Sequence, residues 1–467
     1  AAFENYLGKA IIVPENHEVT GAIGTAIKAM ENKPLNTNFR GFEQIKNIKY
    51  LQSSFECNGC PNVCEIKKVT IDNAKPLYYG GRCEKYEKKK TNEKQLTDLF
   101  KQRDDILLNS YKRSLMGIDS KSFKENEDDN KKIKIGIPYT MLTYEFFPFW
   151  DAFFNELGLK VILSDKTNKK IINEGLSFVI AETCFPMKVV LGHVKNLLDK
   201  GADYIFIPSI RDMPCTNERI EGSRTGSYPC PFVQGISTFV KSSMEIDQEK
   251  IIDPLINFSF REYLKNHQLV KLAKKFNKSR SQIKNAISKA YKAQQYFYNE
   301  IAKKGIEVLK SLKDDEPAAV IVSRPYNSCD ANISMDIPGK LRDIGMQAIP
   351  LDYLPIRSVD IFDNWPNMYW EFGDRILSAV EDSRLYPVYI TNFGCGPDSF
   401  ILQYFERAID RPYLKIEVDE HTAGAGVITR CEAFYDSLSN IKKLREQHKI
   451  KDKPLTKVHE PVFKRKQ

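Results

Sequence analysis

Residues 318–329 read AAVIVSRPYNSC. The small and β-branched apolar residues from Ala318 to Val322 predict a short buried strand, and the polar turn after them ends at Cys329. Similar runs lie at 133–137, 161–163, 204–207, 388–391 and 415–418, with shorter candidates at 178–181 and 347–351. Helical patterns lie between several of these runs, at 145–157, 188–198, 337–344 and 399–409. Strands that alternate with helices in this way predict parallel sheets.

The predicted strands form two sets, at about 132–244 and 316–447. We therefore expect an α/β protein with two Rossmann- or flavodoxin-like parallel-sheet domains, a helical insert between them and a small N-terminal cysteine-rich module. The two halves are candidates for a structural duplication. The expected segments are 1–50, 51–131 (cysteine-rich module and helical linker), 132–250 (first α/β domain), 251–315 (helical segment) and 316–467 (second α/β domain).

The chain has 467 residues, a formal net charge of +9 and ten cysteines. No apolar run approaches the roughly 20 residues that span a bilayer, and the start of the sequence shows no basic-then-apolar signal-peptide pattern, so we expect a cytoplasmic protein with no membrane partner. In a reducing compartment, cysteines are more often metal ligands or catalytic groups than disulfides. The basic residues are spread widely without an aromatic-interleaved motif, so we expect no nucleic-acid partner.

Residues 1–33 contain a few apolar residues and a glycine-containing helix start at Thr20. This is too little to fold alone, so we expect the stretch to be the end of a longer polypeptide.

The tightest group of cysteines is Cys57, Cys60 and Cys64, with Cys83 further along the chain. A compact triplet with one distant cysteine is common for a [4Fe–4S] cluster, and four cysteines also suit structural zinc. Either metal could relay electrons or staple a small module.

Six more cysteines lie mostly in loops after apolar runs: Cys184, Cys215, Cys230, Cys329, Cys395 and Cys431. Ligands of open α/β sheets bind beyond the carboxyl ends of the strands, so thiolates from both halves are expected at one shared cleft. The alternative for each cysteine is a packed core thiol. That alternative is weakest at Cys395, which two glycines and a proline surround, and it is strongest for Cys431 in a predicted helix.

These stretches resemble the 2-hydroxyacyl-CoA dehydratase superfamily, and most closely the activase–dehydratase fusion proteins and the double-cubane cluster proteins. The resemblance covers about 132–444, and the start of the chain resembles the last part of an activase ATPase domain. The matching motifs are KIGIP (134–138), YEFFPFW (144–150), ETCFPMK (182–188), GHV (192–194), YPCP (228–231), SRPYN (323–327), NFGCGPDS (392–399), DEH (419–421) and 424–434.

The resemblance implies that an ATP-hydrolysing [4Fe–4S] activator, fused upstream or separate, injects low-potential electrons into a cluster held between two α/β domains. The leading expectation is a reductase of small molecules with a double-cubane [8Fe–9S] cluster on the six core cysteines, three from each half. One alternative is a 2-hydroxyacyl-CoA dehydratase component with a [4Fe–4S] cluster on three cysteines, ketyl radical chemistry and an acyl-CoA substrate. Another is a non-catalytic electron carrier.

Three side chains near these motifs are candidate proton donors: Glu182, His193 and His421. Each also has an ordinary structural interpretation, as a helix cap, a packed helical histidine and a loop-holding residue. For an acyl-CoA, Arg324, Arg411 and Arg430 could face the diphosphate. By analogy with the family, we expect a homodimer.

Overall fold

The computed structural model describes residues 4, 7–10, 12–13, 16–32, 41–43, 49–57, 64–71, 74–81, 86, 96–115, 132–214, 227–258, 262–313, 316–356, 365, 368–379, 385–422 and 424–448. They fall into two compact units. The first comprises Ala1–Phe55 and Ile66–Tyr79, and the second comprises Glu56–Glu65 and Gly80–Gln467. None of the described helices is both long enough and apolar enough to cross a membrane.

The first unit contains a helix and a small sheet. The short η1 (His17–Val19) leads into α2 (Thr20–Asn32), which confirms the helix start predicted at Thr20. The sheet has the order β1-β2-β3, with β1 (Tyr50–Glu56), β2 (Glu65–Ile71) and β3 (Leu77–Tyr79). Strands β2 and β3 are antiparallel. These three strands were not predicted from the sequence, because polar residues and lysines interrupt any strict alternation.

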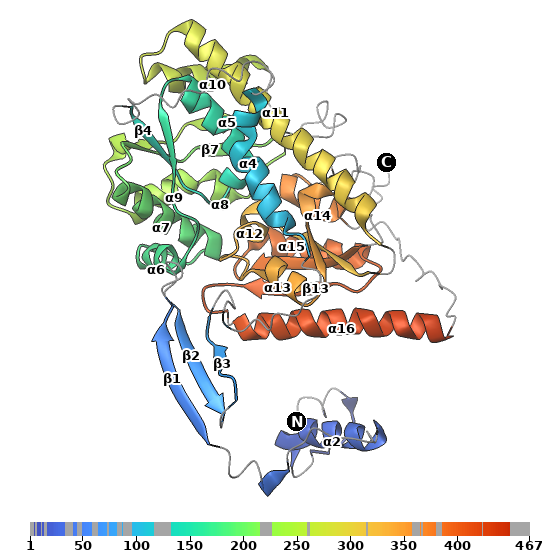
Figure 1. Cartoon of the computed structure of the whole chain (residues 1–467). Coiled ribbons are helices and arrows are strands. Elements are labelled where there is room, and N and C mark those ends of the chain that lie inside the picture. Colours follow the sequence, from blue (N-terminus) through green and yellow to red (C-terminus); the bar gives the residue numbers. More distant parts are fainter. Residues whose placement is uncertain are drawn as a thin grey trace. The chain divides into compact units, whose positions relative to one another are not determined.

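The second unit holds two four-stranded parallel sheets (Figure 1). The first has the order β5-β4-β6-β8 and is formed by β4 (Lys134–Ile137), β5 (Lys160–Leu163), β6 (Tyr204–Phe206) and β8 (Ile251–Ile252). The second has the order β11-β10-β12-β13 and is formed by β10 (Ala318–Val322), β11 (Gln347–Pro350), β12 (Leu385–Asn392) and β13 (Leu414–Val418).

Counted along the chain within its own sheet, each half therefore has the strand order 2-1-3-4. The α/β class with two Rossmann- or flavodoxin-like sheets is confirmed, and the shared order agrees with a structural duplication.

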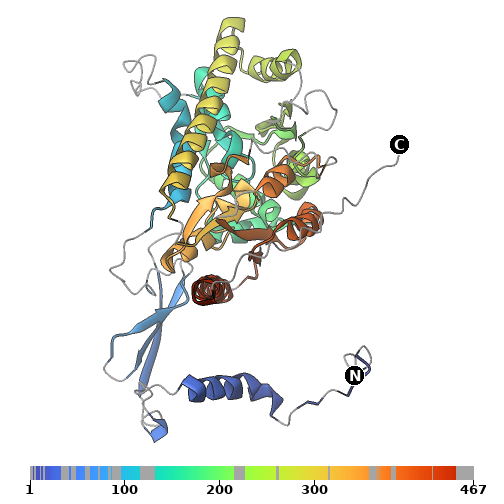
Figure 2. The same ribbon diagram turned by 90° about the vertical axis from the view of Figure 1, so that its right-hand side faces the viewer.

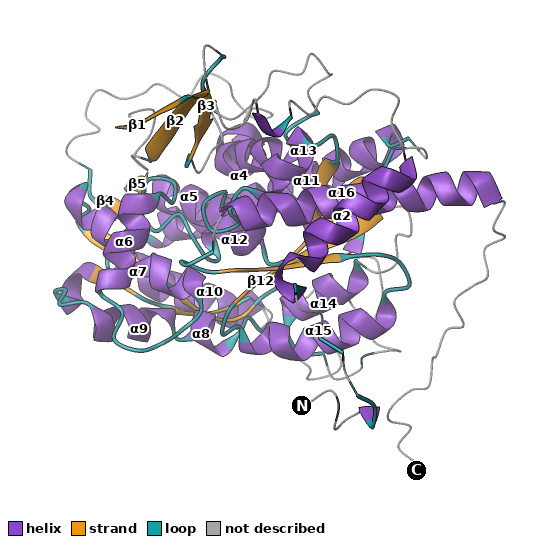
Figure 3. Cartoon of the chain, turned by 90° about the horizontal axis from the view of Figure 1, so that it is seen from below, coloured by secondary structure: helices purple, strands orange, loops and turns teal. Residues whose placement is uncertain are grey.

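Residues of the second sheet alternate between two cores, as the period of a strand requires. Ala319 and Ile321 pack on the face covered by α13 (Ile337–Asp343) and α16 (Gly424–His448). Val320 and its alternate neighbours pack on the face covered by α14 (Glu371–Ser378) and α15 (Gly396–Ala408). Figure 3 shows these helix pairs on opposite sides of β12. Each crossover helix thus begins at the carboxyl edge of the sheet.

In the first half, α5 (Thr143–Glu156) supplies most of the aromatic core. Its Trp150 ring lies 4.7 Å from the ring of Phe206 on β6. The crossover from β5 to β6 contains α6 (Lys169–Ser177) and α7 (Phe185–Asp199). These two helices touch backbone to backbone, because a Cβ placed on Gly192 would lie only 1.8 Å from the carbonyl oxygen of Ile171.

The helical segment predicted between the halves is confirmed as α10 (Glu262–Lys274) and α11 (Arg280–Ser311). A capping box starts α11: the Ser279 hydroxyl accepts from the Gln282 N–H, and the Gln282 amide oxygen accepts from the Ser279 N–H. Helix α11 packs against α5 and α4 (Leu99–Leu115), and Figure 2 shows it lengthwise beside α4.

One predicted strand is wrong. Residues 178–181 form the turn and loop after α6 rather than a strand. Phe178 and Val179 pack against the core from this loop. These residues are therefore apolar because they are partly buried, and not because they belong to a strand. Conversely, the short β7 (Ser209–Asp212) and β9 (Leu255–Asn257), which pair in parallel, were not predicted.

The remaining connections of the second unit are short helices and 3-10 turns. They are α8 (Pro231–Gln234), α9 (Ile236–Ser243), η4 (Gln248–Lys250), α12 (Pro325–Ser328) and η5 (Leu351–Tyr353).

Candidate functional site

Three cysteines occupy the same kind of position, the residue immediately before a helix. Cys184 is the N-cap of α7, Cys230 of α8 and Cys395 of α15, and a proline lies in the first turn of each helix. All three are partly buried. Proline fixes the entry angle of the chain and has no N–H of its own, so it is well suited to the first turn.

These three cysteines lie near one another although they come from both halves. The thiols of Cys184 and Cys230 are close enough for their charges to interact, and so are those of Cys395 and Cys184. The hydroxyl of Tyr326, a buried residue of α12, interacts with all three thiols. We call these three cysteines, with Tyr326 near them, the three-cysteine site.

A buried ion pair borders the three-cysteine site. Arg324 Nη1 donates to Asp398 Oδ1 at 2.7 Å, and the same carboxylate accepts from the hydroxyls of Tyr389 (3.1 Å) and Thr391 (2.7 Å). Burial raises the pKa of the Cys395 thiol to about 12, and the positive Arg324 opposes that rise. Burial also raises the pKa of Cys184, again against Arg324. The guanidinium thus favours the thiolate form that binds metals.

Cys329 lies at the other end of α12, away from that group. Its neighbours are Arg103, Asp352 and the hydroxyl of Ser328, which lies 3.7 Å from its sulfur. Burial raises the pKa of Cys329 to about 12. With Arg103, Asp352 and Arg375 it lines a small pocket that also has apolar walls.

Of the remaining predicted ligands, those that the structure describes are not in the three-cysteine site. Cys431 is fully buried on α16 in the apolar core, among residues such as Val427 and Ile416. Cys57 and Cys64 are buried, and the Cys57 N–H donates to the Cys64 carbonyl at 2.8 Å. Cys60, Cys83 and Cys215 lie outside the described residues. Within the described ranges, no three His, Cys, Asp or Glu side chains form a group that could hold a metal ion.

Two of the predicted proton donors, Glu182 and His421, belong to or adjoin a bridge of ion pairs centred on Lys188. Lys188, in the first turns of α7, binds the carboxylate of Glu182 at 2.8 Å and that of Glu420 at 2.6 Å. Glu182 is 87% exposed, whereas Glu420 is 11% exposed. His421 is 86% exposed, with Nε2 3.9 Å from Glu420. The bridge joins the start of α7 to the loop after β13.

His193 is fully buried on α7, and both ring nitrogens have partners. Thr167 donates its one hydroxyl proton to Asp330, so Thr167 Oγ1 accepts from His193 Nε2 at 2.9 Å. In the neutral ring Nδ1 then accepts from Ser164 Oγ at 2.7 Å, and Ser164 Oγ accepts the Tyr139 N–H, also at 2.7 Å. The hydrogen-bond network assigns this tautomer. Burial lowers the pKa of His193 to about 3, so the ring is neutral near pH 7.

Comparison with known families gives one match. Residues 134–354 match the family model described as the CoA enzyme activase uncharacterised domain. The match spans somewhat less than half of the chain and includes Cys184, Cys230 and Cys329. It is consistent with the activase–dehydratase superfamily.

None of the curated proteins matches the chain. Among solved structures, the C-terminal domain of glucosamine-fructose-6-phosphate aminotransferase from Francisella tularensis is 11% identical with a TM-score of 0.19, covering 74% of this chain and 94% of that one. A putative sugar binding protein from Salmonella typhimurium LT2 is 6% identical with a TM-score of 0.17, covering 73% and 99%. At these scores the likenesses carry no argument.

Several residues of the site were not assigned by sequence reasoning. Arg324 was a candidate for a CoA diphosphate, but it is buried against Asp398. Tyr326 and Asp398 lie inside the quoted motifs SRPYN and NFGCGPDS, yet nothing in those letters shows that they meet. Lys188 likewise reads as an ordinary helical lysine. The signal for each is proximity in space, which one sequence does not contain.

Proposed function

We propose that this chain is an iron–sulfur protein that receives low-potential electrons from an ATP-hydrolysing activator and uses them to reduce a small molecule or an acyl-CoA. The observation that carries the proposal is the gathering of Cys184, Cys230 and Cys395 around Tyr326. The match of residues 134–354 to a CoA enzyme activase domain supports the same area of chemistry.

The donor set suits a [4Fe–4S] cluster. Such clusters are held by cysteine thiolates, and three ligands leave one iron without a protein ligand. A four-iron cluster separates its cysteines more widely than a single ion does, which fits thiols that interact without forming a single-ion site in the described ranges. Thiols of raised pKa release their protons when the metal binds, so loading should be favoured at higher pH.

When bound, the cluster would supply one-electron chemistry and an open iron for a substrate oxygen. The chain's own residues would set its surroundings. Arg324 offsets the negative charge of the thiolates, and Asp398 holds that guanidinium in place. The Tyr326 hydroxyl lies within electrostatic reach of the three thiols and would be a polar neighbour of the cluster.

Exposed aromatic rings adjoin two of the three cysteines in sequence and offer a docking surface for the activator. Phe232 follows Cys230 by two residues and is 47% exposed, and Phe393 precedes Cys395 by two residues and is 70% exposed. Phe400, one turn into α15, is 50% exposed. Large apolar groups left in water near a site of electron entry favour a protein partner.

The placement of two other cysteines favours one three-cysteine cluster over a six-cysteine double cubane. Cys431 packs in the apolar core, and Cys329 faces Arg103 and Asp352. The dehydratase-type arrangement is therefore the form we propose. The [8Fe–9S] cluster and the homodimer stay predictions, as does the [4Fe–4S] or zinc site at Cys57, Cys60, Cys64 and Cys83.

The test is iron and acid-labile sulfide per chain after purification without oxygen, with electron paramagnetic resonance of the reduced protein. We expect C184A, C230A and C395A each to lose about four irons, the content of one cubane. C329A and C431A are the matched controls and should keep them. A loss of about eight irons in C329A and C431A would instead establish the double cubane.

Unchanged iron in C184A, C230A and C395A would overturn the proposal. Zinc is measured in parallel with C57A, so that the separate N-terminal cysteine group is not counted with the core cluster. An unchanged reduced spectrum on adding any substrate candidate would favour a plain electron carrier.

A further inference from the structure

An apolar pocket lies beyond the carboxyl ends of β4 and β6 in the first half. In the order β5-β4-β6-β8, the strand that follows β4 in the chain pairs on one side of it, and β6 pairs on the other side. The pocket therefore lies at the point where the strand order reverses, the switch point of the sheet. Open α/β sheets bind their ligands at this place. The cavity volume is about 40 Å³, so only a small ligand would fit.

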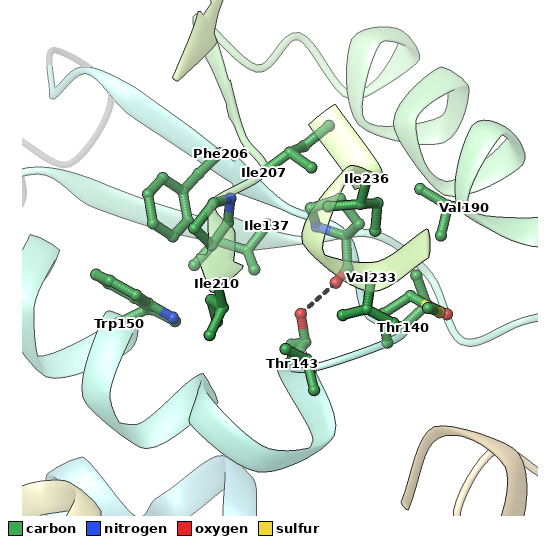
Figure 4. Close-up of a pocket in the computed structure, with 14 residues that line it drawn as sticks. Ile137, Thr140, Thr143, Trp150, Val190, Phe206, Ile207, Ile210, Val233 and Ile236 are labelled. Atoms are coloured by element: carbon green, nitrogen blue, oxygen red, sulfur yellow. Dashed lines mark hydrogen bonds between the residues drawn. The ribbon is translucent and has the colours of Figure 1, made fainter. Parts of the chain in front are cut away.

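The walls of the pocket carry no charge. Its fourteen lining residues, all described, include no acidic or basic side chain. Figure 4 shows Trp150 and Phe206 on one side of the pocket and Val190 on the other. Val233 of α8 and Ile236 of α9 lie between them. Burying an ion here would cost far more than burying an uncharged molecule.

One hydroxyl in this apolar lining has no partner. Thr140 is 2% exposed, and its Oγ1 makes no hydrogen bond among the described residues. The neighbouring Thr143 differs, because its hydroxyl already donates to the Pro138 carbonyl at 2.6 Å (Figure 4). An unmet buried hydroxyl costs about 1–3 kcal/mol, a cost that a ligand can remove.

The backbone beside Thr140 is also unusual. Met141 has a φ of 50°, in the left-handed region that non-glycine residues rarely adopt. Such conformations gather at ligand sites, where the surrounding structure holds them. This turn sets the place of Thr140 between β4 and the start of α5.

We infer that the pocket binds a small uncharged molecule with a short apolar body and one oxygen that hydrogen-bonds to Thr140. Val233 lies three residues after Cys230 on α8, and Val190 lies six residues after Cys184 on α7, or roughly 5 Å and 9 Å of helix. The ligand would therefore lie close to the three-cysteine site. That this ligand is the molecule reduced there rests on the proposed function, whereas its binding does not.

The test is ligand-observed NMR titration of the full chain without oxygen. The probes are 2-butanone, its isostere 2-methyl-1-butene, which lacks the oxygen, and the charged butyrate. We expect 2-butanone to bind about two- to tenfold more tightly than the alkene, the value of one neutral hydrogen bond, and butyrate not to bind. T140V should remove the preference for the ketone, and V233F, which fills the pocket, should abolish binding of both.

S243A is the matched control. Ser243 Oγ is also buried without a partner in the described part of the chain, but it does not line the pocket. The variant should keep the preference for the ketone. Equal binding of ketone and alkene in wild type, binding of butyrate, or a T140V that keeps the preference would overturn the inference.

Iron content separates this inference from the proposed function. Ketone binding in a chain that assembles no cluster would sustain the pocket and remove the proposed function. A chain that assembles its cluster but binds no probe would sustain the proposed function and overturn the inference about the pocket.

Discussion

The Arg324 guanidinium and the Asp398 carboxylate lie 2.7 Å apart, and each side chain is only 3% exposed. Arg324 precedes α12, which carries Tyr326, and Asp398 lies in the first turn of α15, which Cys395 caps. The pair therefore fixes two of the segments that meet at the three-cysteine site. Both charges have been taken out of water, so each depends on the other.

D398N should destabilise the protein by about 3–5 kcal/mol, because it leaves the Arg324 charge buried and uncompensated. The measurement is chemical unfolding without oxygen. The control is E316Q at the Lys313–Glu316 pair, which has the same 2.7 Å separation but is 67% and 60% exposed. That change should cost less than about 1 kcal/mol. Equal effects of the two substitutions would contradict the argument.

His193 predicts a pH dependence of stability. Its folded pKa is about 3, lowered from 6.5 by burial, so below pH 6.5 the unfolded chain takes up a proton that the folded chain refuses. The stabilisation of the folded state that comes from this pKa difference is fully present above pH 6.5. It is lost at about 1.4 kcal/mol per pH unit as the pH falls toward 3.

The check compares unfolding free energies of wild type and H193Q from pH 7.5 to 4.5. The gap between them should narrow as the pH falls. Asp330, whose pKa burial raises to about 6, contributes the opposite slope but is present in both proteins. H421Q, at an exposed histidine, should run parallel to wild type. A constant gap for H193Q would show that the ring takes up its proton at the same pH in the folded and unfolded chains.

S279A should cost about 1 kcal/mol, because it removes the hydroxyl that caps α11. Amide hydrogen exchange in the first turn of α11 should speed up. S281A, at an exposed residue two positions on, should change the exchange by much less. If both variants behave alike, the capping box does not hold the end of the helix.

G192A should destabilise the protein by about 3 kcal/mol, since the added Cβ would meet the Ile171 carbonyl and force α6 and α7 apart. It should also lower iron content, because Cys184 begins α7. G426A on α16 is the control, as nothing lies within 4 Å of its added Cβ. It should be neutral or slightly stabilising. If G192A is destabilised but keeps its full iron content, the position of Cys184 does not depend on the packing of α6 against α7.

Much of the fold could be predicted from local pattern. Ala318–Val322 is a continuous apolar run, whereas Leu414–Val418 alternates apolar residues with Lys415 and Glu417, and both patterns predict strands. The error at 178–181 has the same origin, because a short apolar run also suits a loop that packs on the core. Strands β1 to β3 were missed because their exposed residues do not alternate cleanly.

The site could be predicted less completely. The turn chemistry around Cys395 and the prolines after Cys184 and Cys230 identified three thiols of one kind. Cys329 has a similar sequence setting, but α12 turns it toward Arg103. Which side of a one-turn helix a side chain faces depends on tertiary packing, and so does the distance from Arg324 to Asp398.

For the proposed cluster, the backbone contact of α6 with α7 at Gly192 would bear on the rate of electron transfer. A redox centre reacts quickly when its ligands barely move between the two charge states, so that little reorganisation energy is needed. With Gly175 and Gly192 in direct backbone contact, α7 has almost no freedom to shift along its neighbour. A redox centre bound by Cys184 would then move little between its charge states. Gly175 and Gly192 would in this way affect its electron-transfer rate, although they lie more than a full helical turn from Cys184.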